Sequence, residues 1–111
     1  MKNVMTIDGQ QAVITFEPDI EMFRGEFVGL NGGADFYAPD VTGLRREGEL
    51  SLAAFLDECA KRGIEPLKRF SGKFVLRVSP EVHAAAATAA AASGESLNQW
   101  VAEAIREAAH A

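Results

Sequence analysis

Residues 73–78 read KFVLRV, and this stretch decides the fold of the C-terminal part of the chain. Large apolar residues occupy every second position, which is the period-two pattern of a β-strand with one apolar face. The apolar face comprises Phe74, Leu76 and Val78, and the opposite face comprises Lys73, Val75 and Arg77. The stretch therefore predicts a strand that buries one face and presents the other.

Two helices are predicted directly after this strand. Ser79-Pro80-Glu81 is a strong helix start, because Ser is a preferred N-cap and Pro fits the first helical position. Residues 84–92 are alanine except for Thr88, so helix propensity there is near its maximum, and Gly94 ends the helix. Ser96 is a second N-cap, and the apolar stripe of the last helix comprises Leu97, Val101, Ala104, Ile105 and Ala108.

A strand-helix-helix unit of this length has a single strand with no partner. Both edges of such a strand are unpaired, which makes it unstable or prone to aggregation. The simplest solution is that two copies pair their strands antiparallel over the four helices, as in the ribbon-helix-helix arrangement, whose ribbon enters the DNA major groove. The sequence therefore predicts a homodimer, and further assembly into a tetramer stays open.

This arrangement assigns roles to particular residues. Lys73, Val75 and Arg77 would face the bases, since Arg can read guanine and a Val methyl suits the methyl group of thymine. The backbone amides near Ser96, Leu97 and Asn98 would bind a phosphate at the start of the last helix. The predicted dimer core comprises Phe74, Leu76, Val78, Trp100 and Val101. The alternative for Lys73 and Arg77 is an ordinary solvated strand face.

The N-terminal part predicts a small antiparallel sheet followed by one helix. Apolar runs at 4–7, 11–17, 22–30 and 35–38 are separated by turn signals at Asp8-Gly9, Pro18-Asp19 and Asn31-Gly32-Gly33. A helix is expected from the N-cap Asp40 to Gly63, with its apolar stripe at Val41, Leu44, Gly48, Leu52, Phe55, Leu56 and Cys59. The fold class is α+β, with an N-terminal domain at 1–62, a linker at 63–69 and the second domain at 70–111.

Composition excludes several classes of protein. The 111 residues include one cysteine, which rules out an internal disulfide framework and a Cys-rich zinc site. No stretch approaches the roughly 20 apolar residues that span a bilayer, and no signal-peptide core is visible, so the expected location is the cytoplasm. The net charge of -5 argues against binding nucleic acid by charge alone. We expect no cofactor, no metal and no enzymatic activity.

The N-terminal carboxylates allow three interpretations. Clustered acids could hold magnesium for a residual nuclease, they could form an ordinary solvated surface, or they could dock a basic protein by charge complementarity. The acids weighed for the metal site are Asp8, Glu17, Asp19, Glu21, Glu26 and Asp35. Two of them lie in or near predicted turns, where solvated acids are common, and the solvated surface is favoured over the metal site.

The segment SGKFVLRVSPEVH followed by GESLNQWVAEAI closely resembles the C-terminal part of HicB family antitoxins. TFEPDIEMFRGEFVGL and LAAFLDECAKRGIEP resemble that family's strand-turn-strand segment and its helix with the linker. The resemblance implies a reduced RNase H-like N-terminal domain that binds and blocks a small basic ribonuclease toxin of the HicA kind. It also implies a ribbon-helix-helix domain that binds operator double-stranded DNA and represses the operon.

Carried over by position, the resemblance gives the base-reading role to Lys73, Val75 and Arg77 and the phosphate-binding role to Ser96, Leu97 and Asn98. The acids expected to bind the toxin are Asp19, Glu21 and Glu26. A second interpretation is a solitary ribbon-helix-helix module that dimerises without a toxin partner or DNA. Residues 70–111 carry three Lys/Arg against four Glu, a net charge of -1, and this shortage of positive charge favours the second interpretation.

Overall fold

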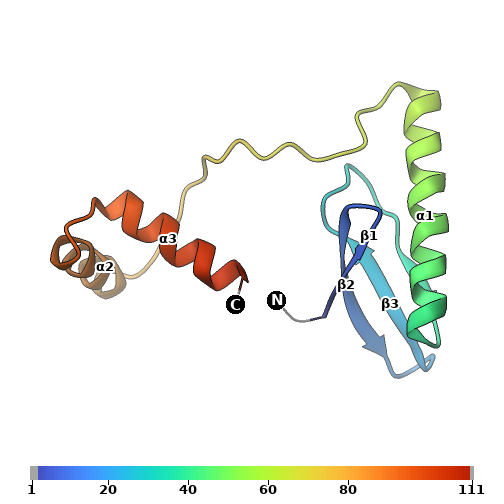
Figure 1. The fold of residues 1–111 in the computed structure, drawn as a ribbon, viewed down its shortest axis with the longest axis horizontal. Helices are drawn as coiled ribbons and strands as arrows, with labels where there is room; N and C mark the ends of the chain where they lie inside the picture. Colours follow the sequence, from blue (N-terminus) through green and yellow to red (C-terminus); the bar gives the residue numbers. More distant parts are fainter. Residues whose placement is uncertain (1–2, 111) are drawn as a thin grey trace. The chain divides into compact units, whose positions relative to one another are not determined.

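The computed structural model describes residues 3–110 and is α+β, with a four-stranded antiparallel sheet and three helices (Figure 1). The chain divides into two compact units, one up to Phe70 and one from Ser71 onward. The strands are β1 (Val4–Ile7), β2 (Gln10–Glu17), β3 (Met22–Phe27) and β4 (Phe36–Ala38), and the helices are α1 (Val41–Arg62), α2 (Pro80–Ala92) and α3 (Leu97–His110). No helix within residues 3–110 has the length and apolar character needed to cross a membrane.

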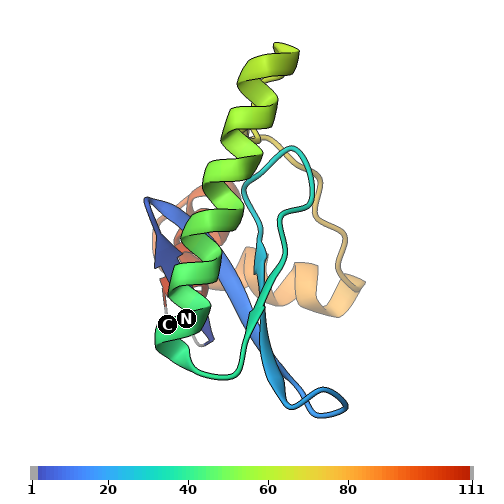
Figure 2. The same cartoon turned by 90° about the vertical axis from the view of Figure 1, so that its right-hand side faces the viewer.

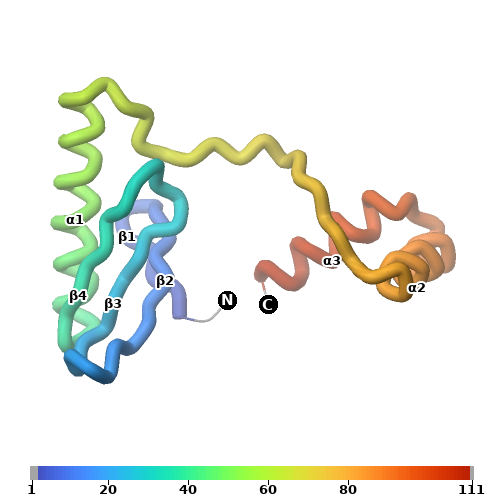
Figure 3. Tube along the Cα trace, turned by 180° about the vertical axis from the view of Figure 1, so that it is seen from behind, coloured from blue at the N-terminus to red at the C-terminus, as the bar shows by residue number. Residues whose placement is uncertain are grey.

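The sheet is a meander in the order β1-β2-β3-β4, and every neighbouring pair is antiparallel, as the sequence predicts (Figure 3). The turn between β1 and β2 is formed by Asp8 and Gly9, whose φ angles of 47° and 83° are both left-handed. Two left-handed residues in succession match the right-handed twist of the strands, which explains why Asp-Gly is a strong hairpin signal. The predicted third strand ends earlier than expected, at Phe27 rather than Leu30.

Helix α1 covers one face of the sheet (Figure 2). Its ends are those that the sequence predicts: the Asp40 carboxylate accepts a hydrogen bond from the Gly43 amide at 2.6 Å, and Gly63 is left-handed at φ 65°. Leu44, Leu52 and Cys59 are buried, in agreement with the predicted stripe. The prediction is wrong for Val41 and Leu56, which stay exposed. Val41 is the first residue of the helix, and Leu56 lies at the flank of the stripe.

The core of the N-terminal unit is organised around Phe36 of the edge strand β4. Its ring lies over Gly25, the residue it faces on β3, and also against Gly48 of α1. A Cβ atom at either glycine would overlap the Phe36 ring, and one at Gly48 would also meet the end of Ile7. The ring of Phe27 adds a tilted contact with its centroid 5.1 Å away. Glycine is therefore required at both positions because helix and sheet approach closely there.

Most of the predicted linker 63–69 is fixed to the N-terminal unit. The Asn31 side-chain amide donates hydrogen bonds to the carbonyl oxygens of Glu65 at 2.9 Å and Leu67 at 3.1 Å. The backbone amide of Asn31 donates to Pro66, and the amide of Lys68 donates to Gly29, each at 2.9 Å. The segment 65–68 is therefore joined to residues 29–31 by an isolated antiparallel bridge between Leu30 and Leu67, rather than being a free tether.

Gly25→Ala should lower the free energy of unfolding of the N-terminal unit by about 1–3 kcal/mol, the usual cost of overpacking a core. The added methyl group would have to displace the Phe36 ring. Gly33→Ala is the matched control, because its Cβ would have nothing within 4 Å. Thermal unfolding followed by circular dichroism compares the two. Equal melting temperatures for both variants would contradict the role given to Phe36.

Asn31→Ala should make the bonds after Lys68 and Arg69 more accessible to trypsin, because two side-chain hydrogen bonds to the segment 65–68 are lost. Each such bond contributes about 1 kcal/mol, so cleavage should become roughly tenfold faster or more if it follows local opening. Asn31→Asp should behave in the same way, since a carboxylate cannot donate to carbonyl oxygens. Unchanged cleavage rates in both variants would show that the side chain does not hold this segment.

Candidate functional site

The residues predicted to form the DNA-reading ribbon lie in an extended segment between Gly72 and the start of α2. All six residues from Lys73 to Val78 are exposed, including the apolar Phe74 at 72%, Leu76 at 58% and Val78 at 50%. The predicted strand is not formed within the single chain. The physical reason is that a strand is stabilised by hydrogen bonds to a neighbouring strand, and no segment of residues 3–110 pairs with this one.

Both ends of this segment have defined local structure. At its start, the Lys73 amide donates to the Ser71 hydroxyl at 3.1 Å, and Gly72 has a left-handed φ of 82°. At its end, the Ser79 hydroxyl accepts a hydrogen bond from the Val82 amide at 3.2 Å, and Pro80 occupies the first position of α2. The predicted helix start is therefore confirmed, and it fixes where the extended segment stops.

The predicted phosphate site lies at the N-terminus of α3. The Ser96 hydroxyl accepts from the Gln99 amide at 3.1 Å, and the Gln99 side chain accepts from the Ser96 amide at 3.0 Å. These reciprocal bonds are a capping box. Among the described residues, no acceptor bonds the amides of Leu97 and Asn98, so these two donors stay available at the positive end of the helix. Such a pair of amides suits an anion.

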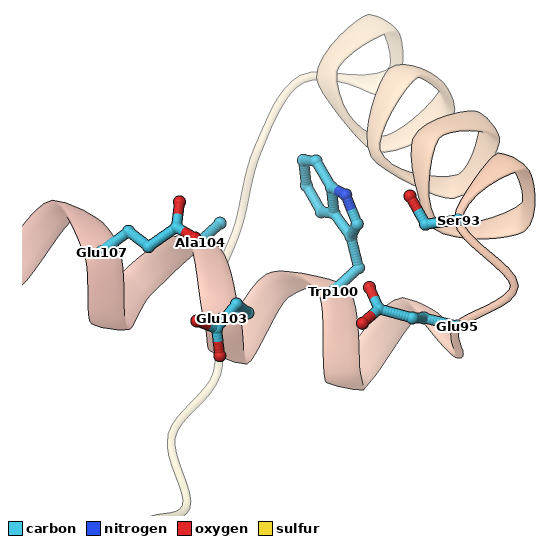
Figure 4. Close-up of a pocket in the computed structure, with 6 residues that line it drawn as sticks. All are labelled: Ser93, Glu95, Trp100, Glu103, Ala104 and Glu107. Atoms are coloured by element: carbon cyan, nitrogen blue, oxygen red, sulfur yellow. The ribbon is translucent and has the colours of Figure 1, made fainter.

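The C-terminal unit leaves its apolar residues largely uncovered. Helices α2 and α3 pack together, yet Ala90 is the one buried residue of α2, and no residue of α3 is buried. Leu97 and Ile105 are exposed on the amphipathic helix α3, and Trp100 and Val101 are half-buried. The indole of Trp100 points from α3 toward α2, beside a hollow of about 300 Å³ (Figure 4). The unit therefore has an apolar surface but no closed core of its own.

The acids proposed to bind a toxin do not lie together. Asp19 and Glu21 are exposed in the turn between β2 and β3, with Glu21 in the left-handed region at φ 52°. Glu26 lies on β3 and faces the open side of the sheet, opposite α1, where its carboxylate is 3.7 Å from Arg24. The three residues therefore belong to two different surfaces of the N-terminal unit.

Arg24 is the centre of the charged group on the open side of the sheet. Its Nε donates to the Asp35 carboxylate at 3.1 Å, and a second nitrogen of the guanidinium also contacts this carboxylate. The hydrogen bond and the charge of Asp35 raise the pKa of Arg24 above its ordinary value. Asp35 is thereby committed to an ion pair. No group of three or more His, Cys, Asp or Glu within residues 3–110 is placed to hold a metal ion.

Sequence reasoning missed two polar contacts of the N-terminal unit. The first is the ion pair between Arg24 and Asp35, which are far apart along the chain and meet because β3 and β4 are neighbours. The second is Asn31, which the sequence marks only as part of an Asn-Gly-Gly turn. A turn signal gives no information about a partner at residues 65–67, so no pattern in the sequence could have identified this contact.

Ser96→Ala should remove one half of the capping box and destabilise α3 by about 0.5–2 kcal/mol, whereas Ser96→Gly should cost only a few tenths. The loss of the Ser96–Gln99 hydrogen bond is the physical cause. Helicity measured by circular dichroism during thermal unfolding tests both variants. Ser71→Ala is the control outside any helix, and a Ser96→Ala variant as stable as this control would contradict the assignment.

The comparisons with known proteins give one match. No curated protein and no solved structure matches the chain. Among protein-family models, that of the HicB family matches residues 55–105. The matched stretch begins in α1 and includes the segment 65–68, the extended segment 73–78, all of α2 and α3 as far as Ile105. Residues 55–105, slightly under half of the chain, are therefore similar to the HicB family.

Proposed function

We propose that this chain is the antitoxin of a type II toxin–antitoxin pair and represses its own operon. The N-terminal unit masks the RNA-binding surface of a small basic ribonuclease of the HicA kind. The unit after Ser71 pairs with that of a second copy, forms a ribbon-helix-helix dimer and binds the operator. The proposal assigns no catalytic step to this chain.

The observation that carries this proposal is the exposed apolar face of the segment 73–78. Phe74, Leu76 and Val78 lie in solvent next to two helices that bury almost nothing. Burying apolar surface contributes roughly 25 cal/mol per Å² to stability. Leaving three large apolar side chains on one face of the segment in water therefore forgoes a large part of this stabilisation. Antiparallel pairing with the same segment of a second copy would place these side chains over the helices and also satisfy the free strand edge.

In such a dimer, the opposite face of the ribbon carries Lys73, Val75 and Arg77 from both copies. Arg77 suits the O6 and N7 acceptors of guanine, and Val75 suits the methyl group of thymine. The free amides of Leu97 and Asn98 would bind the phosphates on either side and fix the position of the ribbon. Lys73 and Arg77 are exposed and make no ion pair with another described residue, which leaves both charges available.

The family match is the second support. HicB family proteins are in general components of toxin–antitoxin systems, and their partner is in general a toxin of the HicA kind. The matched region includes both the extended segment and the helices that would form the DNA-binding dimer. The negative net charge of the whole chain suits a basic protein partner better than it suits binding to DNA by charge alone.

Arg77→Ala should remove the discrimination between operator and unrelated DNA, because each lost Arg–guanine contact is worth about 1–3 kcal/mol and a dimer loses two. A mobility-shift assay with the chain's own upstream DNA and a scrambled duplex measures this ratio. Arg106→Ala is the matched control, since Arg106 lies on α3 and pairs with Glu103 at 3.0 Å. Co-purification of the variant with the product of the adjacent small open reading frame should be unchanged.

The outcomes of these assays separate the candidate functions. Loss of partner binding in Arg77→Ala would contradict the separation into two functional modules. A wild-type chain that dimerises but binds neither the upstream DNA nor the adjacent product would instead support the solitary interaction module, which the shortage of positive charge in residues 70–111 favours. Operator binding that survives in Arg77→Ala as well as in Arg106→Ala would remove Arg77 from base reading.

A further inference from the structure

The N-terminal unit has an uncovered apolar surface at the end of the β2–β3 hairpin. We call it the hairpin patch, and it comprises Ile14, Phe16, Ile20 and Phe23. Phe16 and Ile20 are each 55% exposed. The rings of Phe16 and Phe23 pack edge to face with centroids 5.6 Å apart, so the aromatic part of the patch is ordered by its own contact.

The strand residues of the patch, Ile14, Phe16 and Phe23, lie on the same side of the sheet as α1, and Phe16 lies beyond the area that the helix covers. The register pairs Ala12 with Phe27, Ile14 with Gly25 and Phe16 with Phe23, which places these residues on one face. Burial along β2 decreases from Ala12, which is inaccessible, through the half-buried Ile14 to the exposed Phe16. Figure 2 shows the turn of this hairpin lying away from α1.

An open hollow adjoins the uncovered area, along the part of β2 that extends past its pairing with β1. Its volume is about 460 Å³, and it is lined by Asn3, Ile14, Thr15, Phe16 and Phe23. The backbone at its edge is fixed, because the Ile14 amide donates to the carbonyl oxygen of Asn3 at 2.8 Å. The hollow is therefore built on paired strands, and rigid elements give a more precise docking site than loops do.

The charges next to the patch have one sign. Asp19 and Glu21 flank Ile20 in the exposed turn, and within residues 3–110 neither carboxylate forms an ion pair with Lys or Arg. The open side of the sheet differs, because Arg24 there is in contact with both Asp35 and Glu26. Two surfaces carry candidate acids. On the open side of the sheet the acids face Arg24, whereas at the hairpin patch exposed apolar groups lie beside carboxylates that no described Lys or Arg neutralises.

We infer that the hairpin patch is the docking surface for the basic protein partner, and that the open side of the sheet is not. The inference rests on the proposed function and deepens it. The partner contributes an apolar anchor that enters the hollow, flanked by Lys or Arg side chains that meet Asp19 and Glu21. An anchor in a dehydrated pocket supplies most of the affinity of such an interface, and the surrounding charges speed and orient the encounter.

The test compares two pairs of matched variants in the full chain, with the product of the adjacent small open reading frame as the probe. Phe16→Ser removes an anchor contact in the patch, and Val13→Ser removes a partly exposed apolar residue of the same strand on the open side. Asp19→Lys reverses a charge beside the patch, and Glu26→Lys reverses one on the open side. Titration calorimetry measures each dissociation constant, and thermal unfolding checks that each variant is folded.

We expect Phe16→Ser and Asp19→Lys each to weaken the complex by about tenfold or more, and both open-side variants to bind within about threefold of the wild type. Normal binding by both patch variants, beside a tight wild-type complex, would overturn this inference and leave the proposed function standing. Loss of self-association in Phe16→Ser would also overturn it, because the patch would then be a contact between copies. A wild-type chain that binds no probe would overturn the proposed function and this inference together.

Discussion

A β-strand needs a hydrogen-bonded neighbour, and this requirement determines how the unit after Ser71 must be completed. The segment 73–78 has the alternation of a half-buried strand, yet it is exposed along its whole length within one chain. Helices α2 and α3 follow it in the chain, both begin at well-formed caps, and within residues 3–110 most of their apolar side chains stay uncovered. In the proposed dimer, a second copy of the same segment would pair with the backbone and cover these side chains in one step, and the face with Lys73 and Arg77 would be free to meet DNA.

The two units differ in the way each obtains a core. The N-terminal unit closes its own core, since Phe36 fills the space left by Gly25 and Gly48 and joins the edge strand to α1. The second unit has one buried residue in α2 and none in α3. The first unit therefore has a core within a single chain and the second does not, which is the difference that the proposed function requires between a toxin-binding unit and a dimerising unit. Asn31 shortens the free connection between them by holding the segment 65–68 on the first unit.

Much of this fold is predictable from local sequence, because turns and helix ends depend on a few neighbouring residues. Asp8-Gly9, Asp40, Gly63, Ser79 and Ser96 act as their sequence signals indicate. The features that escaped prediction join residues distant in the chain: Phe36 with its two glycines, Arg24 with Asp35, and Asn31 with residues 65–67. The candidate acids also show that local sequence does not determine where a side chain lies in the fold. The sequence favours an exposed acidic surface, and Asp19, Glu21 and Glu26 are exposed, but only the structure shows that Glu26 faces the open side of the sheet while Asp19 and Glu21 lie in the β2–β3 turn.

The central claim is that the segment 73–78 is paired with its copy in a second chain, and the mass of the free protein in solution tests this most directly. Light scattering coupled to gel filtration should give at least twice the 11.9 kDa of one chain. Leu76→Glu should reduce that mass, because it places two unpaired carboxylates in the centre of the apolar face of the ribbon. A wild-type protein that remains monomeric at concentrations well above those of the binding assays would contradict the account.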